Sequence, residues 1–151
     1  MNLFELLEQD HKQVKAIFEK LCGKEDINLD KREDLFEKLK GELTLHATAE
    51  EMFFYPAIKD DDVTHSMTLE GFEEHKVVKH LLHELDTNDK SRDEWMAKLK
   101  VLKENFEHHV KEEEGDLFKK AKKVLSDDDA QSIADDIEEF KAEIMIAMAK
   151  D

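Results

Sequence analysis

The chain has 151 residues, of which 41 % are charged, and it contains only four glycines and one proline. This composition favours long helices and excludes a β-sandwich or β-barrel, because such folds need frequent turns built from glycine and proline. The formal net charge of −16 predicts no nucleic-acid partner and no membrane partner, because polyanions and anionic lipid would be repelled.

The cysteine content and the hydropathy indicate a cytoplasmic setting. Cys22 is the single cysteine, so an intramolecular disulfide cannot form and a reducing compartment is the simplest one. Residues 1–10 include acids and lack a basic segment followed by an apolar run, so we expect no secretory signal. No stretch approaches the roughly 18 apolar residues that a membrane-spanning helix needs.

Apolar residues recur with helical period along nearly the whole chain. The first predicted helix covers about 3–21, and Gly23 is well placed to end it. A polar link over 24–28 leads to the second helix, over about 35–57, which Pro56 should kink or begin to end.

The second half repeats this plan. Ser66 is the predicted N-cap of the third helix, which continues to Leu85, and the fourth helix extends from Trp95 to Val124. Ser126, followed by three aspartates, opens a fifth helix because acids suit the positive end of the helix dipole. The apolar stripe of this fifth helix is Ile133, Ile137, Phe140, Ile144 and Met148.

Short loops between long amphipathic helices predict antiparallel neighbours. We therefore expect an all-α fold with a single domain over 1–151: an up-down four-helix bundle over about 2–124 and an additional C-terminal helix over about 127–149. The added helix either covers the bundle or forms a homodimer interface, and the sequence does not choose between these roles.

Each of the four bundle helices carries a histidine where its apolar stripe requires a core residue. Two of these helices add a glutamate one turn later on the same face. The six residues are His11, His46, Glu50, His75, His109 and Glu113. A buried ionised carboxylate is costly unless it is paired or bound to a metal, and no lysine or arginine lies nearby on these stripes. The six residues are therefore candidate metal ligands.

Other histidines are not predicted to reach the core. The pairs that begin at His80 and His108 also have the spacing HxxxE, but their helical faces are mostly polar. We expect both pairs to face solvent, together with His65 and His83.

An internal repeat indicates a two-metal site. Residues 10–21 match 74–85 closely, and 46–55 and 109–118 share a histidine, two glutamates and a following apolar pair. Each helical hairpin thus supplies a histidine and then HxxxE. With two terminal histidines per ion and two glutamates that bridge both ions, each ion has four protein ligands. A bridging oxo or hydroxo group would add a fifth ligand to each ion and leave one coordination position open. Such oxygen and nitrogen sites suit iron, with manganese as the second choice and zinc disfavoured by its tetrahedral preference.

The order His, HxxxE, His, HxxxE over about 3–124, with the segment "HATAEEMFFYP", resembles the hemerythrin-like HHE cation-binding domain family. The resemblance implies a non-haem di-iron centre with the six residues as ligands, each hairpin's histidines serving one iron. Oxygen-carrying hemerythrins have HxxxH on the third helix and HxxxxD on the fourth, whereas this chain has Lys79 and Glu113 at the corresponding places. The difference argues against reversible dioxygen transport. His80 or His83 is an alternative source of a fifth nitrogen.

The leading hypothesis for function is a di-iron protein that binds or reacts with O2, NO or peroxide at the open position. One alternative is an iron-binding sensor or iron donor without catalytic turnover, and another is a metal-free interaction bundle that uses its acidic surface or its fifth helix. Turnover would need a proton donor near the site. Tyr55, Glu51 and Glu114 are the candidates, although ordinary roles at the core edge or in solvent also explain them.

Overall fold

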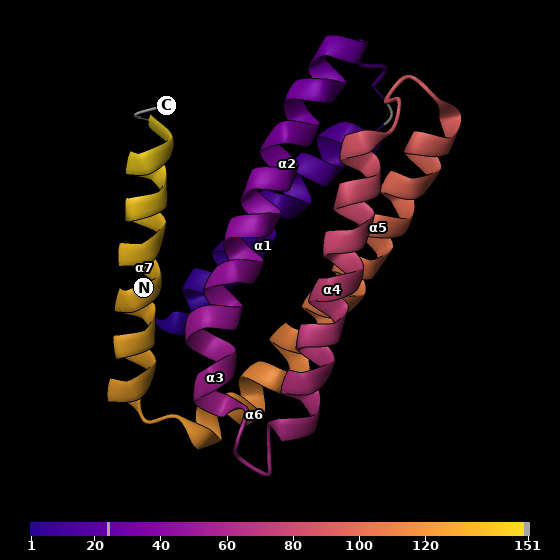
Figure 1. Cartoon of the computed structure of the whole chain (residues 1–151). Coiled ribbons are helices and arrows are strands. Elements are labelled where there is room, and N and C mark those ends of the chain that lie inside the picture. Colours follow the sequence, from indigo (N-terminus) through magenta and orange to yellow (C-terminus); the bar gives the residue numbers. More distant parts are fainter. Residues whose placement is uncertain (24, 150–151) are drawn as a thin grey trace.

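The computed structural model describes residues 1–23 and 25–149, and it is all-helical in these ranges. Four long helices form the expected up-down bundle, and a fifth lies along its outside (Figure 1). The helices of the first hairpin are α1 (Leu3–Cys22) and α2 (Leu29–Ala49), which continues through η1 (Glu50–Phe54) and α3 (Tyr55–Ile58). The second hairpin has α4 (His65–Thr87) and α5 (Asp93–Glu112), which continues through η2 (Glu113–Leu117) and α6 (Phe118–Val124). The outer helix is α7 (Asp127–Ala149).

Side-chain caps explain several helix starts. Asn2 accepts a hydrogen bond from the backbone N–H of Glu5 at 2.9 Å, and the Glu5 carboxylate accepts one from the Asn2 N–H. Ser126 caps α7 as predicted, because its hydroxyl accepts a hydrogen bond from the Asp129 N–H at 3.0 Å. The prediction that Ser66 caps the third helix is wrong. That helix begins at His65 with Thr64 at the N-cap position, two residues before the predicted cap, and the Thr64 hydroxyl donates to the Ile58 carbonyl.

The second and fourth bundle helices each widen into one turn of π-helix that begins at a candidate glutamate. Pro56 was predicted to kink the second helix or to begin its end, and it lies in the first turn of α3, which ends two residues later at Ile58. The proline is not the whole cause, because η2 has the same place in the second hairpin and Lys119 stands at the equivalent position there. Such single π turns are frequent at functional sites.

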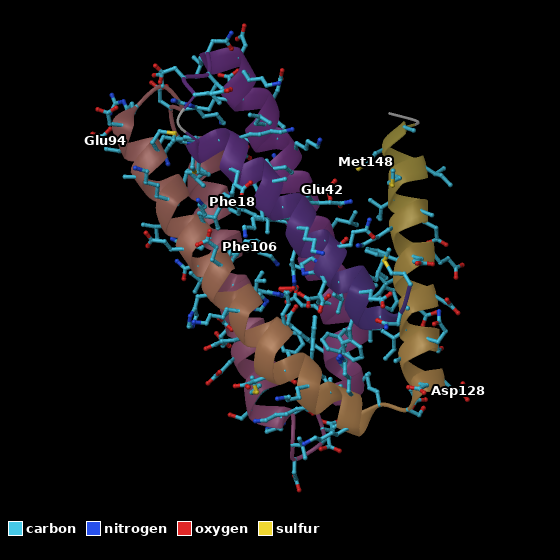
Figure 2. All side chains as sticks on the ribbon, turned by 180° about the vertical axis from the view of Figure 1, so that it is seen from behind. Phe18, Glu42, Glu94, Phe106, Asp128 and Met148 are labelled. Atoms are coloured by element: carbon cyan, nitrogen blue, oxygen red, sulfur yellow. The ribbon has the colours of Figure 1, made fainter. Side chains whose placement is uncertain are left out.

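The core consists of two apolar clusters stacked along the bundle. One lies toward the hairpin loops and includes the neighbouring rings of Phe18 and Phe106, which Figure 2 marks inside the bundle. The other lies toward η1 and η2 and includes Leu3, Phe54 and Leu117. The polar layer described below separates them.

The helix α7 packs against α1, α2 and η1 through only part of its expected stripe. Ile137 is fully buried and Phe140 packs on Phe53, with 5.6 Å between ring centroids. Met148 was expected on this stripe, but it is 67 % exposed near the C-terminal end of the helix (Figure 2). Within the described ranges, no helix combines the length and the apolar character that crossing a membrane would require.

Candidate metal centre

The four core histidines form one layer across the bundle. His11 follows Leu7 and precedes Val14 on α1, so it lies between the two apolar clusters, and the same holds for the histidines of the other three helices. All four are buried, with exposed fractions of 3–6 %. Periodicity alone places each side chain inward, because residues three or four positions apart share a helix face.

The first hairpin brings two imidazoles together. The Nε2 atoms of His11 and His46 are 3.1 Å apart. Glu50 Oε1 lies 2.9 Å from His46 Nε2, and Glu113 Oε1 lies 3.2 Å from His11 Nε2. One donor atom from each of these four buried side chains lies within 4.8 Å of the others.

The second hairpin forms the other half of the centre. Glu50 Oε1 lies 3.3 Å from His75 Nε2 and 4.0 Å from His109 Nε2. Glu113 reaches this half through its other oxygen, which is 3.0 Å from His109 Nε2. Both glutamates therefore contact imidazoles of both hairpins, so the structure brings all six predicted residues together.

The donor set fits a pair of first-row metal ions. Glu50 is fully buried, and among residues 1–23 and 25–149 none donates a hydrogen bond to either of its oxygens, although imidazole nitrogens lie at ion-pair distance. Leaving a buried carboxylate without directed partners is costly, and metal coordination would remove that cost. Imidazole nitrogens and carboxylate oxygens converging from four helices are the ligands that such bundle sites use.

The buried charges control one another's protonation. Burial opposes a charged ring at His46, but Glu50 and Asp10 outweigh that effect and raise its pKa to about 10. Burial likewise opposes ionisation of Glu50, yet the charge of His46 holds the pKa of Glu50 well below its usual range. The pKa of His109 is also raised, because Glu113 outweighs desolvation. Protons and metal ions compete for these nitrogens, so metal binding must release protons.

Every core histidine has a second carboxylate at its outer nitrogen. The Nδ1–H of His46 donates to Asp10 Oδ2 at 2.9 Å. The other Nδ1–carboxylate separations are 3.7 Å for His11 and Glu114, 3.8 Å for His75 and Glu51, and 3.3 Å for His109 and Glu74. The hydrogen-bonded partners of His46 and His109 orient these imidazoles and leave each Nε2 directed at the centre, whereas the carboxylates near His11 and His75 lie beyond hydrogen-bond distance.

Tyr55 also contacts the centre. It is fully buried, and its hydroxyl donates a hydrogen bond to Glu113 Oε2 at 2.7 Å. The Tyr55 hydroxyl oxygen lies 3.4 Å from the Nε2 atoms of both His75 and His109. Burial, and then the charge of Glu113, raise the pKa of Tyr55 well above its usual value, so the phenol keeps its proton. In the π turn the Tyr55 N–H donates to the Glu50 carbonyl, which brings residue 55 to the side of Glu50; in an α-helix a spacing of five residues would not share a face.

Access to the centre is narrow. A pocket of about 10 Å³ lies beside Gly71, His109, Glu113 and Leu117, with Glu70, Glu74 and Glu112 among its other lining residues. This volume holds about one water molecule. A wider pocket, about 340 Å³, lies beside Trp95, near the opposite end of α5 from His109. The geometry therefore favours a very small ligand at the centre.

The predicted solvent-facing histidines are exposed. His80 and His108 are 69 % and 65 % exposed and pair with the glutamates one turn later, at 3.0 and 3.1 Å. His65 and His83 are also exposed. The alternative that His80 or His83 supplies a fifth nitrogen is therefore wrong, because both lie on the outer face of α4.

Two charged residues near the centre, the buried Asp10 and the partly buried Lys141, were not predicted. Asp10 is 8 % exposed and accepts from His46, and Lys141 of α7 forms an ion pair with Asp10. A signal for Asp10 existed, since residue 10 lies three positions after Leu7 and shares the inner face with His11. Lys141 follows Ile137 by one turn, which places it on the docked face of α7.

Comparison with known proteins agrees with this geometry. Residues 2–121 match the sequence model of the hemerythrin HHE cation binding domain. The chain is 27 % identical over 144 residues to a DNA nickase of Nostoc sp. (strain PCC 7120), which covers 95 % of this chain but only 40 % of that protein. A crystal structure of a hemerythrin HHE cation binding domain-containing protein from Mycobacterium kansasii superposes with a TM-score of 0.81 at 23 % identity, covering 99 % of this chain and 93 % of that one. The chain belongs to the hemerythrin HHE cation binding domain family.

Proposed function

We propose that the chain holds two iron ions and binds or reacts with a small ligand such as O2, NO or peroxide. His11 and His46 would hold one ion, His75 and His109 the other, and the two glutamates would bridge them. The observation that carries this proposal is Glu50, a fully buried carboxylate within 4.0 Å of imidazole nitrogens from both hairpins. In the described part of the chain, neither of its oxygens accepts a hydrogen bond. Manganese is the second choice of metal.

When bound, the iron pair would supply electrons to a small oxidant. The protein's own contribution is to exclude water, to orient the imidazoles and to hold a proton nearby. The two apolar clusters enclose the polar layer on both sides. The Tyr55 hydroxyl keeps its proton at neutral pH and lies next to Glu113 and two imidazoles, so it holds a hydrogen-bond donor at the centre.

The size of the access pocket supports a diatomic or peroxide ligand over a larger substrate, since about one water molecule fills it. A second candidate function is an iron-binding sensor or iron donor without turnover. The raised histidine pKa values favour it, because they make iron binding sensitive to pH. In that case iron would raise the melting temperature strongly, while no small oxidant would be consumed.

The name of the Nostoc relative suggests nucleic acid as a partner, but that protein contains much sequence outside the matched region. The net charge of −16 would repel a polyanion, so we propose no nucleic-acid partner for this chain. A supercoiled plasmid should remain intact when incubated with the iron-loaded protein, and accumulation of nicked circles would contradict this.

Metal content tests the proposal most directly. Protein purified without a metal-affinity tag and reconstituted anaerobically with ferrous iron should contain about two irons per chain by mass spectrometry. Exposure of the reduced protein to O2, NO or peroxide should change its visible spectrum. A loaded protein that is spectrally inert to all three would overturn the proposed reactivity.

Adjacent histidines on α5 offer a matched pair of variants. His109→Ala removes a buried imidazole and should lower the iron content to about one ion per chain or less, whereas His108→Ala removes a 65 % exposed one and should leave it unchanged. Equal iron content in the two variants would contradict the proposed ligand set.

A further inference from the structure

The fifth helix reaches the candidate centre through one charged side chain. The helix α7 lies along the α1–α2 side of the bundle (Figure 1), held by the buried Ile137 and by Phe140 against Phe53. Between these apolar contacts and the exposed end of the helix, Lys141 forms an ion pair with Asp10. The family match ends at residue 121, before α7 begins, so it assigns no role to this contact.

Asp10 joins Lys141 to the candidate ligand His46. The same oxygen, Oδ2, accepts from the Lys141 ammonium and from His46 Nδ1–H, the latter at 2.9 Å. The Asp10 side chain is only 11 % exposed, so water cannot fully solvate its charge. A cation at that oxygen keeps the carboxylate ionised and fixes its direction.

The other three outer carboxylates are different. Glu51, Glu74 and Glu114 are 27–32 % exposed and lie at 3.3–3.8 Å from their imidazoles. Within residues 1–23 and 25–149, none of the three forms an ion pair with a lysine or an arginine. The lysine-anchored contact is therefore a feature of one half of the centre, the half that contains His11 and His46.

We propose that Lys141 is a positioning residue that acts through Asp10 on His46. With Nδ1–H held by the anchored carboxylate, the ring directs its Nε2 inward, where it lies 2.9 Å from Glu50 Oε1 and 3.1 Å from His11 Nε2. Outer partners of this kind typically change metal affinity 10- to 100-fold. Docking of α7 thus sets the affinity of one ion and leaves the other unaffected; this inference rests on the proposed metal binding.

The test compares Lys141→Met and Lys141→Arg with Lys98→Met, in the full-length chain. Methionine keeps the length of the side chain and removes its charge, and arginine restores the charge. Lys98 is a matched control, because it forms an ion pair at 2.7 Å with Glu84, a residue outside the centre, and is 32 % exposed. Ferrous iron is titrated anaerobically into each metal-free protein and the two binding steps are followed by calorimetry.

We expect Lys141→Met to weaken one binding step by about tenfold or more and to leave the other within about twofold of wild type. Lys141→Arg and Lys98→Met should leave both steps near wild type. Unchanged affinities in Lys141→Met, equal weakening of both steps, or failure of arginine to restore the weaker step would each overturn the proposal.

A readout without metal separates this proposal from the proposed function. In the metal-free protein, NMR measures how fast the His46 Nδ1 proton exchanges with water, and the hydrogen bond to Asp10 slows that exchange. Lys141→Met should accelerate it about tenfold or more, while Lys98→Met should not. If wild type bound no iron, the proposed function would fall, and this exchange rate would still decide the role of Lys141. An unchanged exchange rate would refute it.

Discussion

Removal of a single oxygen atom tests whether Tyr55 stabilises the centre. Tyr55→Phe deletes the hydroxyl that donates to Glu113 Oε2 at 2.7 Å and keeps the ring, which packs with centroid distances of 5.1 Å to Phe72 and 5.2 Å to His75. A hydrogen bond to a charged group contributes about 1.5–3 kcal/mol, and the variant should lose about that amount because both partners are buried.

The size of the protein converts this free energy into a temperature. At an unfolding entropy of about 2.1 cal/mol/K per residue, a chain of 151 residues unfolds with about 0.3 kcal/mol/K. The melting temperature of Tyr55→Phe should therefore fall by roughly 5–9 °C. Thermal unfolding followed by circular dichroism measures it, both on the metal-free and on the iron-loaded protein.

Thr68→Val is the control. Thr68 is also fully buried, but its hydroxyl donates to a neutral acceptor, the Thr64 carbonyl, at 2.6 Å. Its loss should cost about 1 kcal/mol, which corresponds to about 3 °C. The reasoning would be refuted if Tyr55→Phe melted within about 1 °C of wild type, or if it lost no more than Thr68→Val.

Three further predictions concern pH, packing and assembly. The metal-free protein should lose stability as the pH rises from about 6.5 through about 10, because protonated His46 stabilises the folded state below its unfolded pKa and this stabilisation is lost above its folded pKa. The stabilisation by ferrous iron should grow over the same window, because fewer protons must leave the imidazoles. Equal melting temperatures of the metal-free protein at the two ends of this window would contradict the prediction. Gly71→Ala should lower the free energy of unfolding by about 1–3 kcal/mol in denaturant unfolding, because the new Cβ would lie 2.9 Å from two atoms of Tyr55. Gly41→Ala is the control and should be neutral or stabilising, because its Cβ would have nothing within 4 Å. Equal free energies of unfolding for the two variants would argue against this packing. The exposed apolar end of α7 predicts a homodimer that Ile146→Lys dissociates, and light scattering that gives one monomer mass for both proteins at all concentrations would exclude it.

The sequence was sufficient for the bundle and for the six candidate ligands. Helical period identifies which face of each helix is buried, and a histidine such as His11 between Leu7 and Val14 is then a core residue without further information. The repeat of the pattern in both hairpins distinguished these residues from the exposed His80 and His108.

Contacts between helices were decided only by the tertiary structure. Periodicity gives the face of a residue but not its partner on another helix, so the sequence could place Tyr55 near the core edge without showing that its hydroxyl meets Glu113. The π turns at both glutamates also went unpredicted. The two turns share no local sequence signal, since a proline follows the first and a lysine stands at the equivalent position after the second. The pairing of Asp10 with Lys141 joins residues at opposite ends of the chain, and it exists because α7 docks on the outside of α1 and α2 at one register, which no local pattern specifies.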